Sequence, residues 1–249
     1  MINVILNGCN GRMGIVMQNM IAGTDDMKVV AGIDAKGGEG TSFPIFAKPS
    51  ECTVKGDVVI DFSHYVAVPA LLEYCRASKT AVVIGTTALD EACLKLADEA
   101  SSEIPVFRSA NMSIGINALI KAIQSVMPVL EKNYNVEIIE KHHTKKVDSP
   151  SGTAILLADA VSDACEVKKD YIYGRHSKAD EFKMTNIGIH AVRGGTIPGE
   201  HIVMFAGTDE IIEFKHTALS RDIFAGGAVA AARFVAGKAK GYYSMKDMF

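Results

Sequence analysis

The sequence predicts an α/β protein of two domains, and three observations lead to this fold class. Over the first 112 residues, short apolar runs alternate with segments that carry apolar residues at helical spacing. These runs lack polar alternation, which is typical of parallel strands covered on both faces. Past residue 183, strand-like segments do alternate, and they follow one another without helices between them. We therefore expect a doubly wound parallel sheet, followed by an α+β domain on an open mixed sheet.

The first domain is expected to alternate five strands with three helices. The strands are predicted at residues 2–8, 28–34, 57–63, 80–87 and 104–111. The helices are predicted at residues 11–23, 64–78 and 89–102. An Ala-rich segment near the C-terminus, residues 220–238, has the pattern of a last helix that can pack back on this domain.

The second domain is expected to begin near Asn111, where the pattern changes. A long apolar helix (112–130) precedes the segment 135–143, which begins with the strand "VEIIE", and then a loop and a second helix (153–165) follow. Strand-like segments then follow at residues 183–195, 199–208 and 209–219. These strands lack the helical crossovers that successive parallel strands need, so we expect an antiparallel or mixed sheet.

Composition and charge argue against several classes of protein. The chain has 249 residues, of which 48% are hydrophobic and 22% are charged, as in ordinary soluble domains. The net charge of −3 provides no basic field, so we expect no nucleic-acid or membrane partner. No apolar run reaches the roughly 18–20 residues of a membrane span, and the N-terminus does not have the pattern of a signal peptide. The five cysteines form no C-x-x-C pair, which is typical of a reduced, cytoplasmic protein.

A glycine-rich turn, "NGCNGRMG", joins the first strand to the first helix. It contains Gly8, Gly11 and Gly14, and the helix N-terminus adds a partial positive charge. Glycines permit a sharp turn and let backbone N–H groups approach a pyrophosphate. Asn10 stands where the middle glycine of a dinucleotide-binding loop often lies, and asparagine tolerates left-handed dihedrals. The turn favours a dinucleotide, although glycines also close ordinary strand–helix connections.

An acidic residue at the end of the second strand strengthens this interpretation. Asp34 can accept hydrogen bonds from ribose hydroxyls, and a solvated strand-end carboxylate is the alternative. Lys36 can instead meet a 2′-phosphate, so both NADH and NADPH are expected as cofactors. The segments Gly85–Thr87 and Ser109–Ser113 follow later strands, at the edge where a doubly wound sheet binds its ligand.

A basic loop in the second domain is the other candidate site. His142 and His143 follow the strand "VEIIE", and Lys146 adds a cation. The N–H groups of Gly152 and Thr153, at the start of the next helix, can bind an anion. The loop suits a small substrate with carboxylates, with a histidine or lysine as proton donor. A solvated loop is the alternative. We expect no metal, because adjacent histidines on a strand end point apart and no third ligand has suitable spacing.

Seven segments resemble, in order and over nearly the whole chain, those of the 4-hydroxy-tetrahydrodipicolinate reductase (dihydrodipicolinate reductase) family of lysine and diaminopimelate biosynthesis. They are "GCNGRMG", "VIDFS", "VIGTT", "SANMSIGIN", "EIIEKHHTKKVDSPSGTA", "VRGGTIPGEH" and "HTALSRDIFAGGAV". The resemblance implies a Rossmann domain at residues 1–112 plus 218–249, and a substrate-binding and oligomerisation domain at residues 113–217. It implies NAD(P)H-dependent reduction of a cyclic dihydrodipicolinate-type dicarboxylate to tetrahydrodipicolinate by a cytoplasmic homotetramer.

The resemblance also implies roles for individual residues. His142 matches the catalytic proton donor and Lys146 the second catalytic residue, while His143, Gly152 and Thr153 match substrate contacts. The matching dinucleotide contacts are Gly8, Cys9, Asn10, Gly11, Arg12, Met13, Asp34, Gly85, Thr86, Thr87, Ser109, Ala110, Asn111 and Met112. The departures from the family pattern are Asn10, Asp34, Ser109 and Met112. The chemistry agrees, because hydride delivered into a conjugated imine leaves electron density that a nearby histidine can protonate.

Two other functions stay open on the sequence. A different split-Rossmann dehydrogenase, such as a semialdehyde dehydrogenase, needs a nucleophilic cysteine near the nicotinamide. Cys9 and Cys165 lie in no evident nucleophile setting. A non-catalytic regulator that senses NAD(H) needs an interaction surface, and it leaves the combination of His142, Lys146 and the Gly152 turn unexplained.

Overall fold

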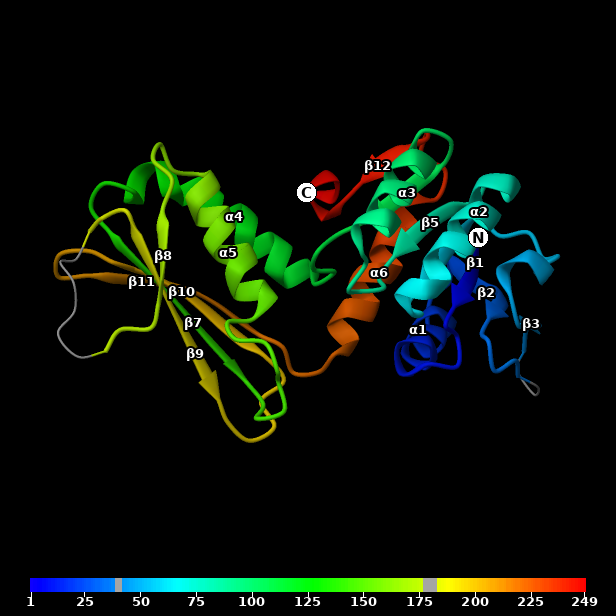
Figure 1. Cartoon of the computed structure of the whole chain (residues 1–249), viewed down its shortest axis with the longest axis horizontal. Helices are drawn as coiled ribbons and strands as arrows, with labels where there is room; N and C mark the ends of the chain where they lie inside the picture. The colour runs from blue at the N-terminus through cyan, green and yellow to red at the C-terminus, as the bar shows by residue number, and fades with distance from the viewer. Residues whose placement is uncertain (39–41, 177–182) are drawn as a thin grey trace. The chain divides into compact units, whose positions relative to one another are not determined.

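The computed structural model describes residues 1–38, 42–176 and 183–249, and the chain divides into two compact units (Figure 1). The first unit comprises Met1–Ile114 and Asp222–Phe249, and the second comprises Gly115–Arg221. The chain therefore leaves the first unit once and returns to it near its C-terminal end.

The first unit is built on a seven-stranded sheet whose neighbouring strands all pair in parallel. Its strands are β1 (Ile2–Asn7), β2 (Met27–Ile33), β3 (Ile45–Phe46), β4 (Val58–Asp61), β5 (Ala81–Ile84), β6 (Pro105–Arg108) and β12 (Gly241–Tyr243). Their order is β12-β6-β5-β4-β1-β2-β3, which reverses between β1 and β4. Doubly wound sheets bind their ligands in the crevice at such a reversal. The predicted doubly wound sheet is confirmed, with β3 and β12 as unpredicted short additions.

Helices cover both faces of this sheet. α1 (Arg12–Ala22) and α6 (Asp222–Val235) contribute to the core on one face, and α2 (Val68–Ser78) and α3 (Glu91–Ser101) to the core on the other. Successive strand residues point to opposite faces, so Val4 and Leu6 join the first core while Ile5 joins the second. Because both faces are covered, the strands need no polar alternation. The described residues of the unit also form three short 3-10 helices: η1 (Pro49–Glu51), η2 (Tyr65–Ala67) and η3 (Met245–Met248).

The C-terminal helix α6 lies close to the sheet because its buried residues are small. A Cβ on Gly227 would lie 1.6 Å from the carbonyl oxygen of Met112, so only glycine permits this approach. Ala228, Ala231 and Ala232 are fully buried in the same core. The Ala-rich pattern of this segment thus reflects close packing against the segment after β6.

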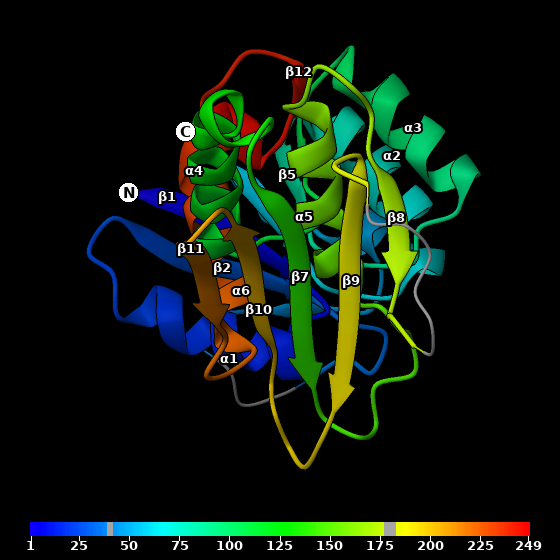
Figure 2. The same cartoon turned by 90° about the vertical axis from the view of Figure 1, so that its left-hand side faces the viewer.

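In the part of the chain that the structure describes, the second unit has a five-stranded mixed sheet with two helices on one face. Its strands are β7 (Asn135–His142), β8 (Asp170–Tyr173), β9 (Asn186–Arg193), β10 (Glu200–Ala206) and β11 (Ile211–Thr217), in the order β11-β10-β7-β9-β8. β10 pairs antiparallel with β7 and β11, whereas β9 pairs parallel with β7 and β8. Figure 2 shows the sheet in front of α4 (Ile114–Leu130) and α5 (Gly152–Asp163). The predicted open mixed sheet is confirmed, and β8 is an addition.

Strand β7 alternates strictly between partly exposed and buried side chains. Val136 and Ile138 belong to the hydrophobic core beneath α4 and α5. The same alternation buries Glu140 and His142 farther along the strand. A carboxylate and an imidazole therefore continue an apolar row, and such buried polar groups require hydrogen-bond partners.

Candidate active site

The glycine-rich turn after β1 is the first part of the candidate site. Gly8 has a φ of +78°, and a Cβ there would lie 2.6 Å from the carbonyl oxygen of Phe62. A Cβ on Gly14 would lie 2.3 Å from the carbonyl oxygens of Gly8 and Cys9. The glycine-rich loop after β1 and the first turn of helix α1 are thus in close backbone contact. This bare backbone at a helix N-terminus fits the pyrophosphate of a dinucleotide.

Asp34 connects this turn to the end of the second strand. Its carboxylate accepts hydrogen bonds from the backbone N–H of Asn10 at 3.0 Å and from that of Lys36 at 3.1 Å. The Asn10 side chain donates to the carbonyl oxygen of Gly37 at 2.5 Å. Asn10 does not have a positive φ, so the left-handed conformation allowed for from the sequence is not adopted. Asn10 instead contributes two hydrogen bonds that hold the turn.

A buried polar cluster joins the carboxyl ends of β1, β4 and β5. Asp61 is fully buried and accepts hydrogen bonds from the Asn7 amide at 2.7 Å and the Ser63 hydroxyl at 2.6 Å. The Ser63 N–H also donates to the Thr86 hydroxyl at 2.9 Å. Burial raises the pKa of Asp61. Thr86 was predicted from the sequence and the other three were not, although "VIDFS" ends an apolar strand on polar residues.

The other predicted dinucleotide contacts lie after strands of the same sheet. Gly85 follows β5, where a Cβ would lie 2.4 Å from the Phe62 ring. Thr87 and Arg12 are exposed, while Cys9 is buried. The segment Ser109–Met112 follows β6. Because all these strands are parallel, their carboxyl ends share one edge of the sheet, and the predicted contacts gather along it.

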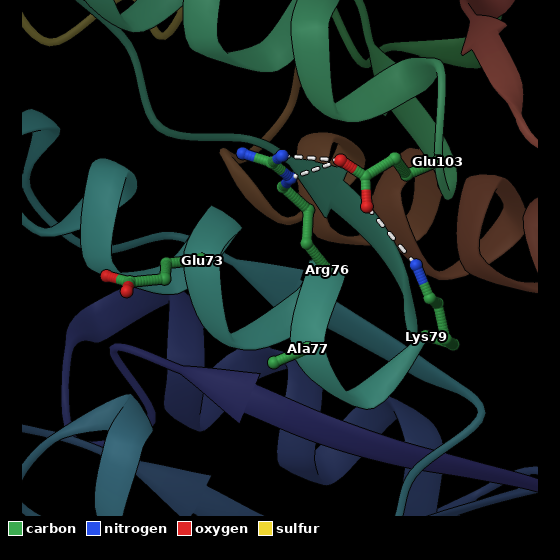
Figure 3. A pocket seen from close by; sticks show the side chains of 5 residues that line it. All are labelled: Glu73, Arg76, Ala77, Lys79 and Glu103. Carbon is green, nitrogen blue, oxygen red and sulfur yellow. Dashed lines mark hydrogen bonds and ion pairs between the residues drawn. The ribbon is translucent and has the colours of Figure 1, made fainter.

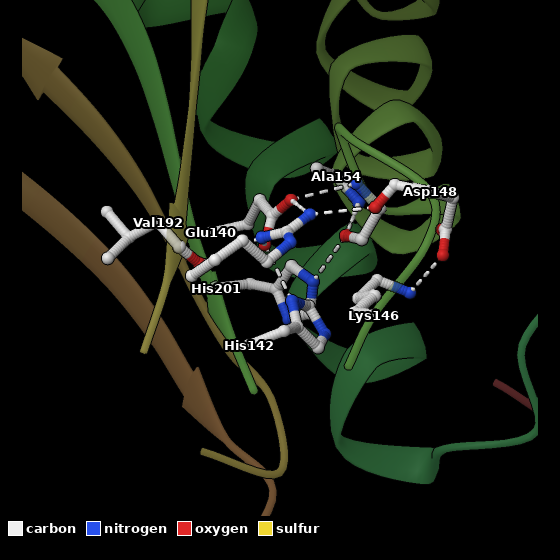
Figure 4. Close-up of polar contacts among 9 residues, drawn as sticks. Glu140, His142, Lys146, Asp148, Ala154, Val192 and His201 are labelled. Atoms are coloured by element: carbon white, nitrogen blue, oxygen red, sulfur yellow. Dashed lines mark hydrogen bonds and ion pairs between the residues drawn. The ribbon is translucent and has the colours of Figure 1, made fainter. Parts of the chain in front are cut away.

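The second part of the candidate site is a buried hydrogen-bond network around Glu140, shown in Figure 4. One carboxylate oxygen of Glu140 lies 2.6 Å from His142 Nδ1 and 2.7 Å from an Arg193 nitrogen. The other oxygen accepts from the Ser151 N–H at 3.0 Å and from Arg193 at 2.6 Å. Arg193 also donates to the carbonyl oxygen of Asp148 at 2.8 Å. The network therefore joins β7, β9 and the loop that precedes α5.

The register of this sheet brings three histidines, on β7, β10 and β11, into neighbouring positions. His142 is the last residue of β7, not a residue beyond it as expected, and its ring centroid lies 5.1 Å from that of His201 on β10. Burial lowers the pKa of His142, and the neighbouring Glu140 opposes this shift. Burial lowers the pKa of His201 to about 4. His216 on β11 faces His201 in the register and also has a lowered pKa from burial.

The loop between β7 and α5 places a cation at the start of the helix. Lys146 forms an ion pair with Asp148 at 2.9 Å, which lowers the pKa of that carboxyl; the backbone of Gly152 is a smaller cause. Ser151 caps α5, because its hydroxyl accepts from the Ala154 N–H at 3.1 Å. A carboxylate is thus already stabilised beside the lysine and the helix N-terminus.

His142, Lys146 and the helix start were predicted from the sequence, whereas four residues of the network were not. The missed residues are Glu140, Ser151, Arg193 and His201. Ser151 Oγ lies 2.9 Å from His201 Nε2, although fifty positions separate the two residues in the chain. The quoted segment "VRGGTIPGEH" contains Arg193 and His201, but only strand pairing shows that both lie beside β7.

Two other pockets are lined by neither His142 nor Lys146, the predicted catalytic residues. One, of about 320 Å³, is lined by Glu73, Arg76, Ala77, Lys79 and Glu103 (Figure 3). Glu103 pairs there with both cations, at 3.2 Å from Lys79, near the amino ends of the strands. The other, of about 730 Å³, lies in the second unit beside Pro150 and Tyr173. Neither lies at the strand ends where a doubly wound sheet binds its ligand.

No cluster of three or more metal-ligating side chains occurs within residues 1–38, 42–176 and 183–249. Among the helices of these ranges, none combines the length and apolar character that crossing a membrane requires. Burial raises the pKa of the Cys9 thiol and of the Cys165 thiol to about 11, which suits neither to nucleophilic attack.

The fold and the site define a class of protein: a two-unit NAD(P)-dependent oxidoreductase with a doubly wound first unit. Family models described as dihydrodipicolinate reductase, N-terminus and C-terminus, match residues 2–112 and 115–249. The chain belongs to this family. The predicted family, fold class and NAD(P)H-dependent activity are therefore confirmed, and neither the semialdehyde dehydrogenase nor the non-catalytic regulator is retained.

Individual relatives agree with this assignment. A 4-hydroxy-tetrahydrodipicolinate reductase of Caldanaerobacter subterraneus is 48% identical and covers 100% of this chain and 98% of the relative. One of Clostridium tetani is 45% identical and covers 100% of this chain and 97% of the relative. Among solved structures, dipicolinate-bound dihydrodipicolinate reductase from Paenisporosarcina sp. TG-14 has a TM-score of 0.82 at 23% identity, with 100% coverage of both chains, which supports the fold.

Proposed function

We propose that this chain reduces the cyclic dihydrodipicolinate-type dicarboxylate to tetrahydrodipicolinate with NADH or NADPH, as a cytoplasmic enzyme of lysine and diaminopimelate biosynthesis. The observation that carries the proposal is the Glu140–His142 pair at 2.6 Å, in one loop region with Lys146 and the N-terminus of α5. The arrangement supplies a proton donor and two anion-binding groups. Those are the groups that reduction of a dicarboxylate imine requires.

His142 is proposed to donate the proton that completes the reduction. When bound, NAD(P)H supplies the hydride. Lys146 then stabilises the electron density that develops in the ring, and it binds a substrate carboxylate together with His143. The second carboxylate would meet the N–H groups of Gly152 and Thr153. The ion pair of Asp148 with Lys146 supports this assignment, because it stabilises one carboxylate at the helix start already.

The dinucleotide is proposed to bind along the carboxyl edge of the first sheet. Gly8–Met13 would hold the pyrophosphate, and Asp34 would accept from the ribose hydroxyls. Gly85–Thr87 and Ser109–Met112 would line the nicotinamide end. The close backbone contacts of Gly8 with Phe62 and of Gly14 with the turn support this assignment, since they hold the turn tightly at the N-terminus of α1.

The second unit is proposed to assemble the chain into a homotetramer. Its sheet carries α4 and α5 on one face only, as Figure 2 shows. The other face, within the described ranges, carries Ile139 and Met204, with the buried Ile202, between ion pairs such as that of Glu200 with Lys215 at 2.8 Å. An apolar strip with paired charges suits an interface between identical subunits.

Coupled turnover tests the proposed function. Dihydrodipicolinate synthase generates the unstable substrate in the cuvette, and loss of NADH absorbance reports its reduction. We expect turnover that requires the synthase and both of its substrates. His142→Gln should lower kcat by about 10²–10⁴-fold, the usual contribution of a general acid, while NADH affinity stays within twofold. Turnover without the synthase, or an unaffected His142→Gln variant, would contradict the proposal.

A further inference from the structure

We infer that Glu140 is the positioning residue of the active site: it holds the His142 proton on Nδ1, turns Nε2 toward the substrate, and ties His142 to the start of α5. The inference deepens the proposed function and rests on it for the role of His142. Glu140 and His142 are both buried, so their hydrogen-bond partners determine how they act.

The partners of Glu140 determine its protonation state. An ionised carboxylate has about four acceptor positions, and all four are used here. Arg193 donates to both oxygens at 2.6 and 2.7 Å, and the Ser151 N–H donates at 3.0 Å. These groups can only donate, and a bidentate guanidinium strongly favours the ionised form. The fourth partner, His142 Nδ1 at 2.6 Å, must therefore carry its hydrogen toward Glu140.

The opposite side of the His142 ring is kept open by a glycine. A Cβ on Gly199 would lie 3.1 Å from His142 Nε2. With the hydrogen held on Nδ1, Nε2 is the nitrogen that gains and releases the proton during turnover. The other ionisable groups toward this ring are Lys146 from the loop, Arg193 from β9 and His201 from β10.

Glu140 also connects the proton donor to the anion-binding helix. The Ser151 N–H that it accepts belongs to the residue that caps α5. The Ser151 hydroxyl accepts from Ala154 at 3.1 Å and lies 2.9 Å from His201 Nε2. One carboxylate thus sets the distance between the imidazole and the helix start. Loss of this carboxylate should impair proton transfer and substrate binding together.

The variant Glu140→Gln tests the inference, because an amide keeps the shape and loses the charge. Its NH₂ group can donate to His142 Nδ1 and so favours the wrong tautomer, with the hydrogen on Nε2. We expect kcat to fall by up to about 10⁴-fold, the loss that follows when a buried aspartate that orients a catalytic histidine is replaced by asparagine. The alkaline limb of the kcat profile should move to lower pH, because the carboxylate no longer raises the pKa of His142.

Glu103→Gln is the control. Glu103 lies near the amino ends of the first sheet, away from both parts of the candidate site, and it also pairs with two cations, Arg76 Nε at 3.0 Å and Lys79 at 3.2 Å. The control loses an equivalent charge away from His142. We expect kcat and the pH profile to stay near those of the parent. Equal effects of the two variants would show a general structural role for Glu140 and would overturn the inference.

A measurement without substrate separates this inference from the proposed function. Nitrogen-15 NMR of the labelled parent should show neutral His142 with its hydrogen on Nδ1. A hydrogen on Nε2 would overturn the inference, whether or not Glu140→Gln folds. If the parent shows this tautomer but oxidises no NADH in the coupled assay, the proposed function fails and the positioning by Glu140 still holds.

Discussion

Among single residues, His142 is the one at which burial and the charge of Glu140 shift the pKa in opposite directions. Burial lowers its pKa, so the free site binds fewer protons near neutral pH than an exposed histidine would. A dianionic ligand favours the imidazolium, so binding should take up a proton and weaken as the pH rises. We expect the Kd of a cyclic dicarboxylate analogue of the proposed substrate to rise several-fold between about pH 6 and pH 8. Calorimetry in two buffers measures the proton uptake, and a Kd independent of pH would contradict this account.

His201 should make the stability of the fold sensitive to acid. Its pKa falls from 6.5 to about 4 in the folded chain, so the folded form resists protonation. The stability of the fold, measured as the free energy of unfolding, is therefore highest above the unfolded pKa of His201. It decreases as the pH falls through the window from 6.5 to 4. The loss amounts to at most about 3 kcal/mol. Urea unfolding at pH 7.5 and pH 5 should show a smaller difference for His201→Gln than for the parent; equal differences would place the acid sensitivity elsewhere.

At the scale of elements, the junction between the turn after β1 and helix α1 should tolerate no side chain. A Cβ on Gly14 would lie 2.3 Å from two carbonyl oxygens, so Gly14→Ala must push the turn away from the helix. We expect fluorescence titration to show at least tenfold weaker binding of both NADH and NADPH. Gly23→Ala, at the other end of α1, is the control, because its Cβ would meet only an ordinary contact at 3.5 Å. Unchanged affinities in Gly14→Ala would remove the turn from the cofactor site.

The loop after β2 should set the preference between the two cofactors. Lys36 is exposed, and its backbone N–H is bound by the Asp34 carboxylate. Lys36→Ala should weaken NADPH several-fold and leave NADH nearly unchanged, because only NADPH carries the extra phosphate. An exposed lysine–phosphate contact contributes on the order of 1 kcal/mol and should weaken with salt. Titration of both cofactors at two salt concentrations tests this; an equal change for both would show that Lys36 does not contact the phosphate.

At the scale of the whole molecule, assembly should depend on the uncovered face of the second sheet. Met204 pairs in register with Glu137 and Glu213, so Met204→Lys gains neighbouring carboxylates within the subunit. The same lysine would bring an unmatched charge into a subunit interface, at a large desolvation cost. We expect light scattering to show a tetramer for the parent and smaller species for the variant, with NADH affinity retained. A tetrameric variant would place the interface on another surface.

The sequence by itself determined the class of the fold and the location of most of the candidate site. Apolar strands without alternation require cover on both faces, and few residues other than glycine fit at close backbone contacts. The local sequence was therefore enough to predict β1, α1 and the turn of Gly8 and Gly14. The loop from His142 to Gly152 could also be predicted locally, because its charged and anion-binding groups follow one another in the chain. Only the tertiary structure decided what surrounds His142. Strand pairing brings Arg193 and His201 beside it from some fifty residues away, and burial makes Glu140 a bound acceptor rather than a solvated acid. Pairing and burial are properties of the packed sheet, and no local pattern encodes them.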